Sequence, residues 1–177
     1  MLVDDQKITP NLWFDDQAEE AARYYVSIFK DSEILAISRY GSGEPMPEGS
    51  VPTVPLILEG QSFTALNGGP QFTFSEAISF IVHCSTQEEV DHYWERLSEG
   101  GDAKAQMCGW FKDGYGVSWQ IVPDALIDYM TDSDPAKAQW TMQAMLRMKK
   151  LDSAALKRAH DGTDAASTAT ERPEGSG

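Results

Sequence analysis

The chain is poor in cysteine, histidine and basic residues. Its 177 residues include 2 cysteines, 3 histidines and 14 Lys plus Arg against 28 Asp plus Glu, so the formal net charge is -14. This charge repels phosphate backbones and anionic lipid headgroups, so we expect neither nucleic acid nor a membrane surface as a partner. The cysteines, Cys84 and Cys108, lie in apolar runs without metal-site or redox-motif spacing. We therefore expect reduced, mostly buried thiols.

Long apolar runs are also missing. No stretch approaches the roughly 18 consecutive apolar residues of a membrane-spanning helix. Residues 1–7 are too polar for a secretory signal peptide, so we expect a cytoplasmic protein. Hydrophobic residues nevertheless make up 41% of the chain, which is enough for a sizeable core in one domain or two tightly joined modules.

The order of predicted elements in the first half is strand, helix, strand, strand, strand. Alternation of apolar residues predicts the first strand, and helical spacing predicts a helix with Asp16 as its N-cap. A loop rich in glycine and proline over 41–49 follows the second strand and could cover a cavity. The predicted ranges are 8–14 for the first strand, 17–29 for the helix, and 32–40, 51–59 and 61–67 for the other strands.

The second half repeats this order. A capping box of Thr86 and Glu89 starts its helix, and Asp113-Gly114 forms the turn of its closing hairpin. A repeat of about 70 residues is too long for a solenoid unit, so it indicates a duplicated half-domain. The predicted strands are 77–85, 104–108 and 117–122, and the modules are 6–70 and 76–123 within a domain spanning 6–123.

Helices are predicted after Pro123, as an extension over 124–160. A short helix over 124–130 precedes a longer one that starts at Asp134-Pro135, and a last one spans 151–159. The longer helix has a Met-rich stripe, expected to be a packing face rather than a cofactor site: Trp140, Met142, Met145, Leu146 and Met148. Residues 161–177 lack large apolar side chains, so we expect a disordered tail.

A group of short motifs carries a family resemblance. They are ITPNLWF at 8–14, the pairs Tyr24-Tyr25 and Ile28-Phe29, ALNGGP at 65–70, CGW at 108–110 and WQIVP at 119–123. Together they resemble the PhnB-like branch of the vicinal-oxygen-chelate superfamily, which includes glyoxalase I, bleomycin-resistance proteins and extradiol dioxygenases. The resemblance implies an α+β fold of two βαβββ modules around an open, barrel-like cavity, and a homodimer.

Members of this branch are often labelled 3-demethylubiquinone-9 3-methyltransferase. A methyltransferase ordinarily needs a glycine-rich turn between a strand and a helix of a doubly wound sheet. Glycines here are followed by strands or loops instead: Gly41, Gly43, Gly68 and Gly69. Methyl transfer is therefore the least favoured of the functions considered.

The resemblance also raises the question of a metal. Metal-dependent members hold a divalent ion with His or Gln on a module's first strand and Glu on its last. The corresponding positions here hold Thr9 and Ser79 on first strands, Ala65 with nearby Asn67, and Gln120. We therefore predict no cofactor and no tightly bound metal. A metal-dependent lyase, isomerase or dioxygenase using Gln120, His83 and Asn67 with water is the alternative.

A polar and aromatic set remains as the candidate site. If Thr9, Ser79 and Gln120 face the cavity, period-two alternation adds their neighbours, and Trp119 packs against the helices. We expect the site to sequester a small amphipathic or aromatic ligand, while His92 and His160 are solvated. Catalytic residues are not assigned, and an interaction scaffold built on the Met-rich helix is a third possibility. The predicted ligand-binding residues are Thr9, Asn11, Trp13, Phe63, Asn67, Ser79, His83, Ser118 and Gln120.

Overall fold

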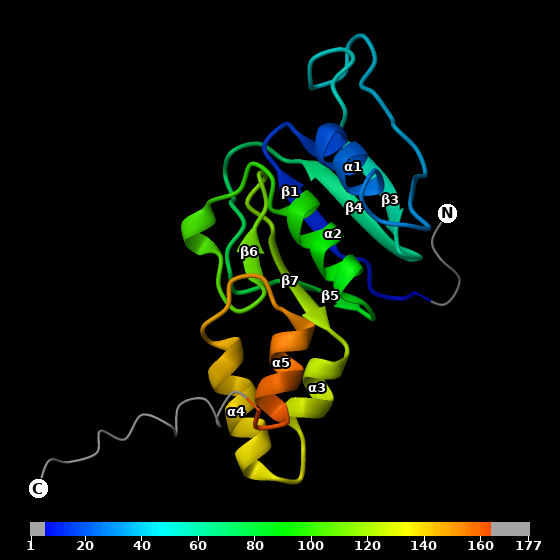
Figure 1. The fold of residues 1–177 in the computed structure, drawn as a ribbon. Helices are drawn as coiled ribbons and strands as arrows, with labels where there is room; N and C mark the ends of the chain where they lie inside the picture. The colour runs from blue at the N-terminus through cyan, green and yellow to red at the C-terminus, as the bar shows by residue number, and fades with distance from the viewer. Residues whose placement is uncertain (1–5, 164–177) are drawn as a thin grey trace, which may run out of the picture. The chain divides into compact units, whose positions relative to one another are not determined.

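The computed structural model describes residues 6–163, and the chain divides into two compact units, Met1–Glu76 and Ala77–Gly177 (Figure 1). Each unit combines one open β-sheet with helices, which confirms the predicted α+β class. The C-terminal helices belong to the second unit. No helix within the described range is long and apolar enough to cross a bilayer.

The first unit is a βαβββ module, as predicted. Its sheet has the order β1-β4-β3-β2, in which β1 runs parallel to β4 and the other neighbours are antiparallel. Glu59 and Gly60, with φ of 45° and 73°, form the two-residue turn between β3 and β4. The elements are β1 (Asn11–Phe14), α1 (Ala18–Val26), β2 (Glu33–Ile34), β3 (Thr53–Leu58) and β4 (Gln61–Asn67).

Helix α1 starts at a cap supplied by a distant residue. The expected cap Asp16 is wrong: Gln17 is the N-cap and makes no side-chain cap bond. Oδ1 of Asn67 instead accepts a hydrogen bond from the Ala18 N–H at 2.7 Å, while its Nδ2 donates to the Val51 carbonyl at 2.9 Å. The Asn67 side chain therefore joins the helix start to the end of β4 and to the chain before β3.

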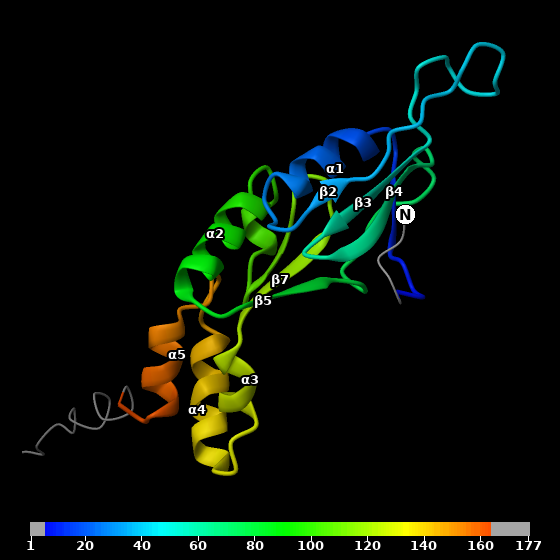
Figure 2. The same ribbon diagram turned by 90° about the vertical axis from the view of Figure 1, so that its right-hand side faces the viewer.

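Strand β2 is far shorter than the predicted range of 32–40. It pairs with β3, and one further bond joins the Leu35 N–H to the Pro55 carbonyl at 2.9 Å. Because Pro55 has no N–H to donate, the ladder ends there. The following loop extends away from the sheet of its unit (Figure 2), and bonds between Tyr40 and residues 49–50 close its base.

The corner after β4 is shaped by the Trp13 ring. Its Nε1 donates to the Gly69 carbonyl at 2.8 Å, and its ring contacts Phe72 edge-on at a centroid distance of 5.0 Å. A Cβ at Gly68 would overlap the indole. The ALNGGP motif is thus a packing motif: Asn67 caps the start of α1, and Gly68 leaves space for the Trp13 indole.

Within residues 77–163, the second unit has three strands, one fewer than the first. Its sheet has the order β5-β7-β6, with β5 parallel and β6 antiparallel to β7. Helix α2 packs along β7 and β5. The elements are β5 (Phe80–Cys84), α2 (Gln87–Leu97), the 3-10 helix η1 (Ala103–Ala105), β6 (Trp110–Lys112), β7 (Ser118–Pro123), α3 (Ala125–Met130), α4 (Pro135–Met145) and α5 (Ser153–His160).

The predicted strand over 104–108 is wrong, because local turns replace it. Asp102 caps η1 by accepting a bond from the Lys104 N–H at 2.8 Å. Cys108 and Gly109 then turn the chain with positive φ, and their N–H groups donate to the carbonyls of residues 148 and 149 rather than to a neighbouring strand. Only an isolated bridge between Met107 and Trp110 remains.

The hairpin between β6 and β7 is organised by a buried carboxylate. Oδ1 of Asp113 accepts bonds from the N–H groups of Tyr115 and Val117, at 2.9 and 3.0 Å. Its Oδ2 accepts a bond from Nε1 of Trp119 at 2.8 Å. Trp119 is buried on the α2 side of the sheet, as predicted, so one side chain fixes both the turn and the following strand.

Helix α2 begins at Thr86, as predicted. The Thr86 hydroxyl accepts a bond from the Glu89 N–H at 3.2 Å. The Glu89 carboxylate accepts bonds from the N–H and the hydroxyl of Ser85, the residue before the cap, each at 2.9 Å.

The C-terminal helices lie side by side (Figure 2). They have their own apolar cluster, formed by Leu126, Leu151 and Leu156. Met145 and Met148 of the predicted stripe pack against it, whereas the other three members are exposed: Trp140, Met142 and Leu146. The stripe is therefore a packing face only in part.

Histidine His160 is not solvated as expected. Its side chain is 12% exposed, lies 2.9 Å from Asp132 through Nε2, and stacks on Tyr129 at a centroid distance of 4.5 Å. Asp161 caps the end of α5, so the predicted tail begins too early. The rest of that predicted tail, 164–177, lies outside the described residues.

Candidate functional site

Helix α2 covers one face of the second unit's sheet, and the opposite face, called the open face below, is only partly exposed. Register places Phe80, Phe111 and Trp119 on the α2 side. Four predicted site residues lie on the opposite side, and they share a face as predicted: Ser79, His83, Ser118 and Gln120. Nε2 of Gln120 donates to Oγ of Ser79 at 2.9 Å, which orients the amide across β5 and β7.

Ser118 contains an unsatisfied buried group. The residue is 2% exposed, and among the described residues its hydroxyl has no hydrogen-bond partner. Burying a hydroxyl without a partner is unfavourable by about 1–3 kcal/mol, so native proteins seldom leave one. A ligand oxygen or a water would satisfy it.

Two open-face residues were not identified from the sequence. Register pairs Trp110 with Gln120 and Lys112 with Ser118, so both side chains lie on the same face as the polar set. A flat indole and an ammonium thus flank the two polar residues of β7. Alternation along β6 from the buried Phe111 could have identified them.

His83 lies at the far end of this face. Its side chain is 67% exposed, and Nδ1 is 3.9 Å from the Asp124 carboxylate, which is itself exposed. The separation is too long for a hydrogen bond. His83 therefore shares the face with Gln120 without being held in a catalytic geometry.

In the first unit the predicted residues are split between two faces. Asn11 and Trp13 lie on the open face, with Thr9 just before the strand. Phe63 and Asn67 lie on the α1 face, because Asn67 pairs with the buried Phe14 and caps α1. The prediction that all of them share one face is wrong, and Thr64, which pairs with Asn11, is the open-face residue of β4.

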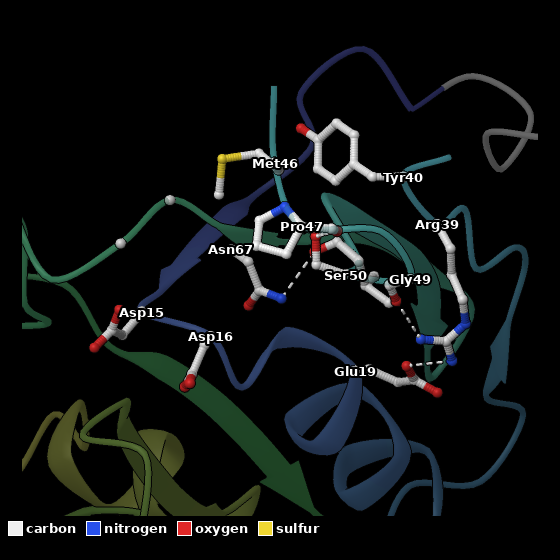
Figure 3. A pocket seen from close by; sticks show the side chains of 13 residues that line it. Asp15, Asp16, Glu19, Arg39, Tyr40, Met46, Pro47, Gly49, Ser50 and Asn67 are labelled. Carbon is white, nitrogen blue, oxygen red and sulfur yellow. Dashed lines mark hydrogen bonds and ion pairs between the residues drawn. The ribbon is translucent and has the colours of Figure 1, made fainter. Parts of the chain in front are cut away.

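A pocket of about 590 Å³ lies at the end of the first unit's sheet, beside the start of α1 (Figure 3). Of the predicted site residues only Asn67 lines it. Arg39 bridges it, donating to Glu19 at 2.8 Å and to the Gly49 carbonyl at 3.1 Å. Hydrogen bonds from Arg23 and Arg39 lower the pKa of Glu19. These polar groups already have protein partners, so they serve the fold.

The donor set does not fit a divalent metal. Within residues 6–163, no three His, Cys, Asp or Glu side chains are grouped as ligands would be. Gln120 and Ser79 bond to each other, and the Asn67 amide, proposed as a ligand in the enzyme alternative, is occupied by α1 and Val51. Burial, followed by the charges of Glu89 and Asp124, raises the pKa of Cys84 to about 12, so this thiol is neither ligand nor nucleophile at neutral pH.

Comparison with known proteins identifies the family to which the domain is similar. The sequence profile of the family described as 3-demethylubiquinone-9 3-methyltransferase matches residues 6–122. A PhnB protein from Bacillus cereus, described by the same name, is 39% identical with a TM-score of 0.61, and the match covers 67% of this chain and 99% of that one. No curated protein matches the chain.

More distant structures share the fold alone. A protein from Pseudomonas aeruginosa has 21% identity and a TM-score of 0.56 over 67% of this chain and 98% of its own. A fosfomycin resistance protein from Mesorhizobium loti has 14% identity and a TM-score of 0.52 over 72% and 98%. The profile match covers the motifs described above except the last residue of WQIVP. The chain therefore belongs to the PhnB-like family described as 3-demethylubiquinone-9 3-methyltransferase.

Proposed function

We propose that this protein binds a small amphipathic or aromatic organic ligand on the open face of the β5-β7-β6 sheet, without a tightly held metal ion. The observation that carries the proposal is the Ser118 hydroxyl, which is buried and has no partner among the described residues. A site built to receive a ligand oxygen has this property, because the bond missing in the free protein forms on binding.

The neighbours of Ser118 supply the other properties of a small-molecule site. Gln120 lies two residues further along β7, held by its bond to Ser79, and Trp110 is paired opposite it. An oriented amide fixes a ligand by hydrogen bonding, while an indole offers a flat apolar surface. In the first unit's pocket, Arg39, Glu19 and Asn67 are already bonded within the protein, so that pocket is the weaker candidate.

Neither competing activity is supported by an observation of this kind. The metal-dependent enzyme needs anionic or imidazole ligands, whereas on this face the Gln120–Ser79 pair is neutral and His83, paired with Val122, is 67% exposed. Methyl transfer needs a doubly wound sheet with a glycine-rich turn before a helix, whereas each sheet here is small and the Gly68-Gly69 turn follows β4 without leading into a helix. The homodimer implied by the resemblance remains part of the proposal.

The test is a native mass spectrometry screen of small aromatic and amphipathic compounds against the intact protein. Gln120→Ala should weaken binding of any hit by about tenfold or more, with the free energy of unfolding changed by less than about 1.5 kcal/mol. Gln143→Ala, at an exposed position of α4, is the matched control and should bind as the wild type does. Unchanged affinity in Gln120→Ala, or no hit for the wild type, would refute the proposal.

Elemental analysis separates the proposal from the enzyme alternative. Protein purified without chelator or metal-affinity tag should carry far less than one divalent ion per chain. Stoichiometric metal would favour the metal-dependent activity instead.

A further inference from the structure

We infer that Asn67 is a deamidation site whose reaction is held back by the fold, and that its conversion loosens one wall of the first unit's pocket. Asn67-Gly68 is the only Asn-Gly sequence in the chain, since the other asparagine, Asn11, precedes a leucine. Asparagine is chemically labile, and a following glycine favours deamidation because it has no Cβ to hinder the approach of its nitrogen to the side-chain amide. The inference concerns the first unit and does not depend on the proposed ligand face.

The reaction consists of a ring closure and a hydrolysis. The backbone nitrogen of Gly68 loses its proton and attacks Cγ of Asn67. A new N–C bond forms, the C–N bond of the side-chain amide breaks, and ammonia leaves with the proton. Water then opens the cyclic imide at either carbonyl, which leaves aspartate or isoaspartate at position 67. Water is the only other reactant.

Both reacting groups are held in the structure. The Gly68 N–H donates to the Phe14 carbonyl at 2.9 Å, so the nitrogen that must lose its proton is engaged in a backbone bond. The Asn67 amide is fixed at both ends, by the Ala18 N–H at 2.7 Å and by the Val51 carbonyl at 2.9 Å. The ring can close only after these groups separate, so the reaction proceeds through a locally opened corner.

The aspartate product would keep one of the two amide bonds and lose the other. A carboxylate still offers an oxygen to the Ala18 N–H, and its negative charge suits the start of a helix. It has no N–H to donate to the Val51 carbonyl, so two acceptor oxygens would face each other there. Gly49, Ser50 and Val51 line the pocket beside Asn67 (Figure 3), so deamidation loosens this wall while the helix cap persists.

Peptide mass spectrometry of the aged protein measures the conversion at Asn67, with Asn11 as the internal reference. In the folded protein the conversion should be about tenfold or more slower than in the chain unfolded in guanidinium chloride. Ala18→Pro removes the N–H that holds Oδ1, at the first helical position, where proline is tolerated, and should speed the conversion in the folded state. Equal rates in folded and unfolded wild type, no conversion in either, or a wild-type rate in Ala18→Pro would overturn the inference.

Asn67→Asp carries the product side chain from the start, so it tests the consequence separately. Amide hydrogen exchange should quicken by about fivefold or more at Tyr40, Gly49 and Ser50, whose N–H groups bond across the base of the loop, while α1 stays protected. Asn11→Asp makes the same change at an exposed position and should exchange as the wild type does. Exchange in Asn67→Asp that matches this control would show that the pocket wall does not depend on the amide.

Discussion

Burial has different consequences for two side chains of the second unit, the Ser118 hydroxyl and the Cys84 thiol. The Ser118 hydroxyl has no partner among the described residues, which a ligand can correct. The Cys84 thiol is equally buried, but it avoids the cost of a buried charge by staying protonated. Only the first of these groups leaves a hydrogen bond unmade within the described residues.

Stability should therefore depend on pH through Cys84. Its pKa rises from 9.0 to about 12 on folding, chiefly through burial. The unfolded chain loses this proton at a lower pH than the folded one. The stabilising contribution of the protonated Cys84 thiol to folding is therefore intact below pH 9 and declines between pH 9 and about 12. Between pH 8 and 10 the free energy of unfolding should fall by about 1.4 kcal/mol from this group.

Urea denaturation with a reductant present would measure this effect. Cys84→Ala removes the thiol but leaves every lysine and tyrosine in place, so its stability should fall less steeply over the same pH interval. Parallel pH dependence in the two proteins would show that the thiol does not titrate differently in the folded state.

At the scale of elements, helix starts and hairpins could be predicted where the residues that determine them lie close together in the sequence. Thr86 starts α2 because its own hydroxyl binds the helix N–H three residues on, and the β3–β4 hairpin follows from apolar runs separated by Gly60. The shortened β2 and the missing strand at 104–108 depended on partners far along the chain: Pro55 for one, and residues 148–149 for the other. No local pattern contains that information.

The same distinction between local signals and distant contacts applies to the candidate site. Alternation from Gln120 correctly grouped the open-face residues of β7 with Ser79 and His83. In β4 the run from Phe63 to Asn67 has apolar residues on both faces, so alternation alone does not show that Asn67 faces α1 and accepts the bond from the Ala18 N–H. The residues that carry the family resemblance include Trp13 and Gly68, which pack the corner rather than line the site.

The corner after β4 allows a direct test of that packing role. Gly68→Ala would place a methyl group inside the Trp13 ring, displacing the indole from the Gly69 carbonyl. Overpacking of this kind should lower the free energy of unfolding by about 1–3 kcal/mol. Gly41→Ala is the matched control, since a Cβ there has no neighbour within 4 Å and should change stability by less than about 1 kcal/mol. Equal stability of the two variants would rule out the packing role.

At the scale of the whole chain, the helices α3 to α5 lie beyond the profile match, which ends at residue 122. Hydrogen bonds and an ion pair nevertheless join these helices to the rest of the second unit. The N–H groups of Cys108 and Gly109 donate to residues 148 and 149, and Gln87 of α2 bonds the backbone of Leu151 and Ser153. Lys150 also pairs with Asp91 at 2.7 Å, and its hydrogen bond lowers the pKa of that carboxyl.

These contacts predict that the extension and the sheet of the second unit unfold together. Leu151, which is 1% exposed, should be the sensitive position: Leu151→Ala should cost about 2–5 kcal/mol, whereas Leu146→Ala, at a residue 62% exposed, should change stability by less than about 0.5 kcal/mol. Native-state hydrogen exchange should show the loss at Gly109 and Ile121 as well as in the helices. Faster exchange confined to α3–α5 would instead make the extension an independent folding unit, whose loss the sheet would survive.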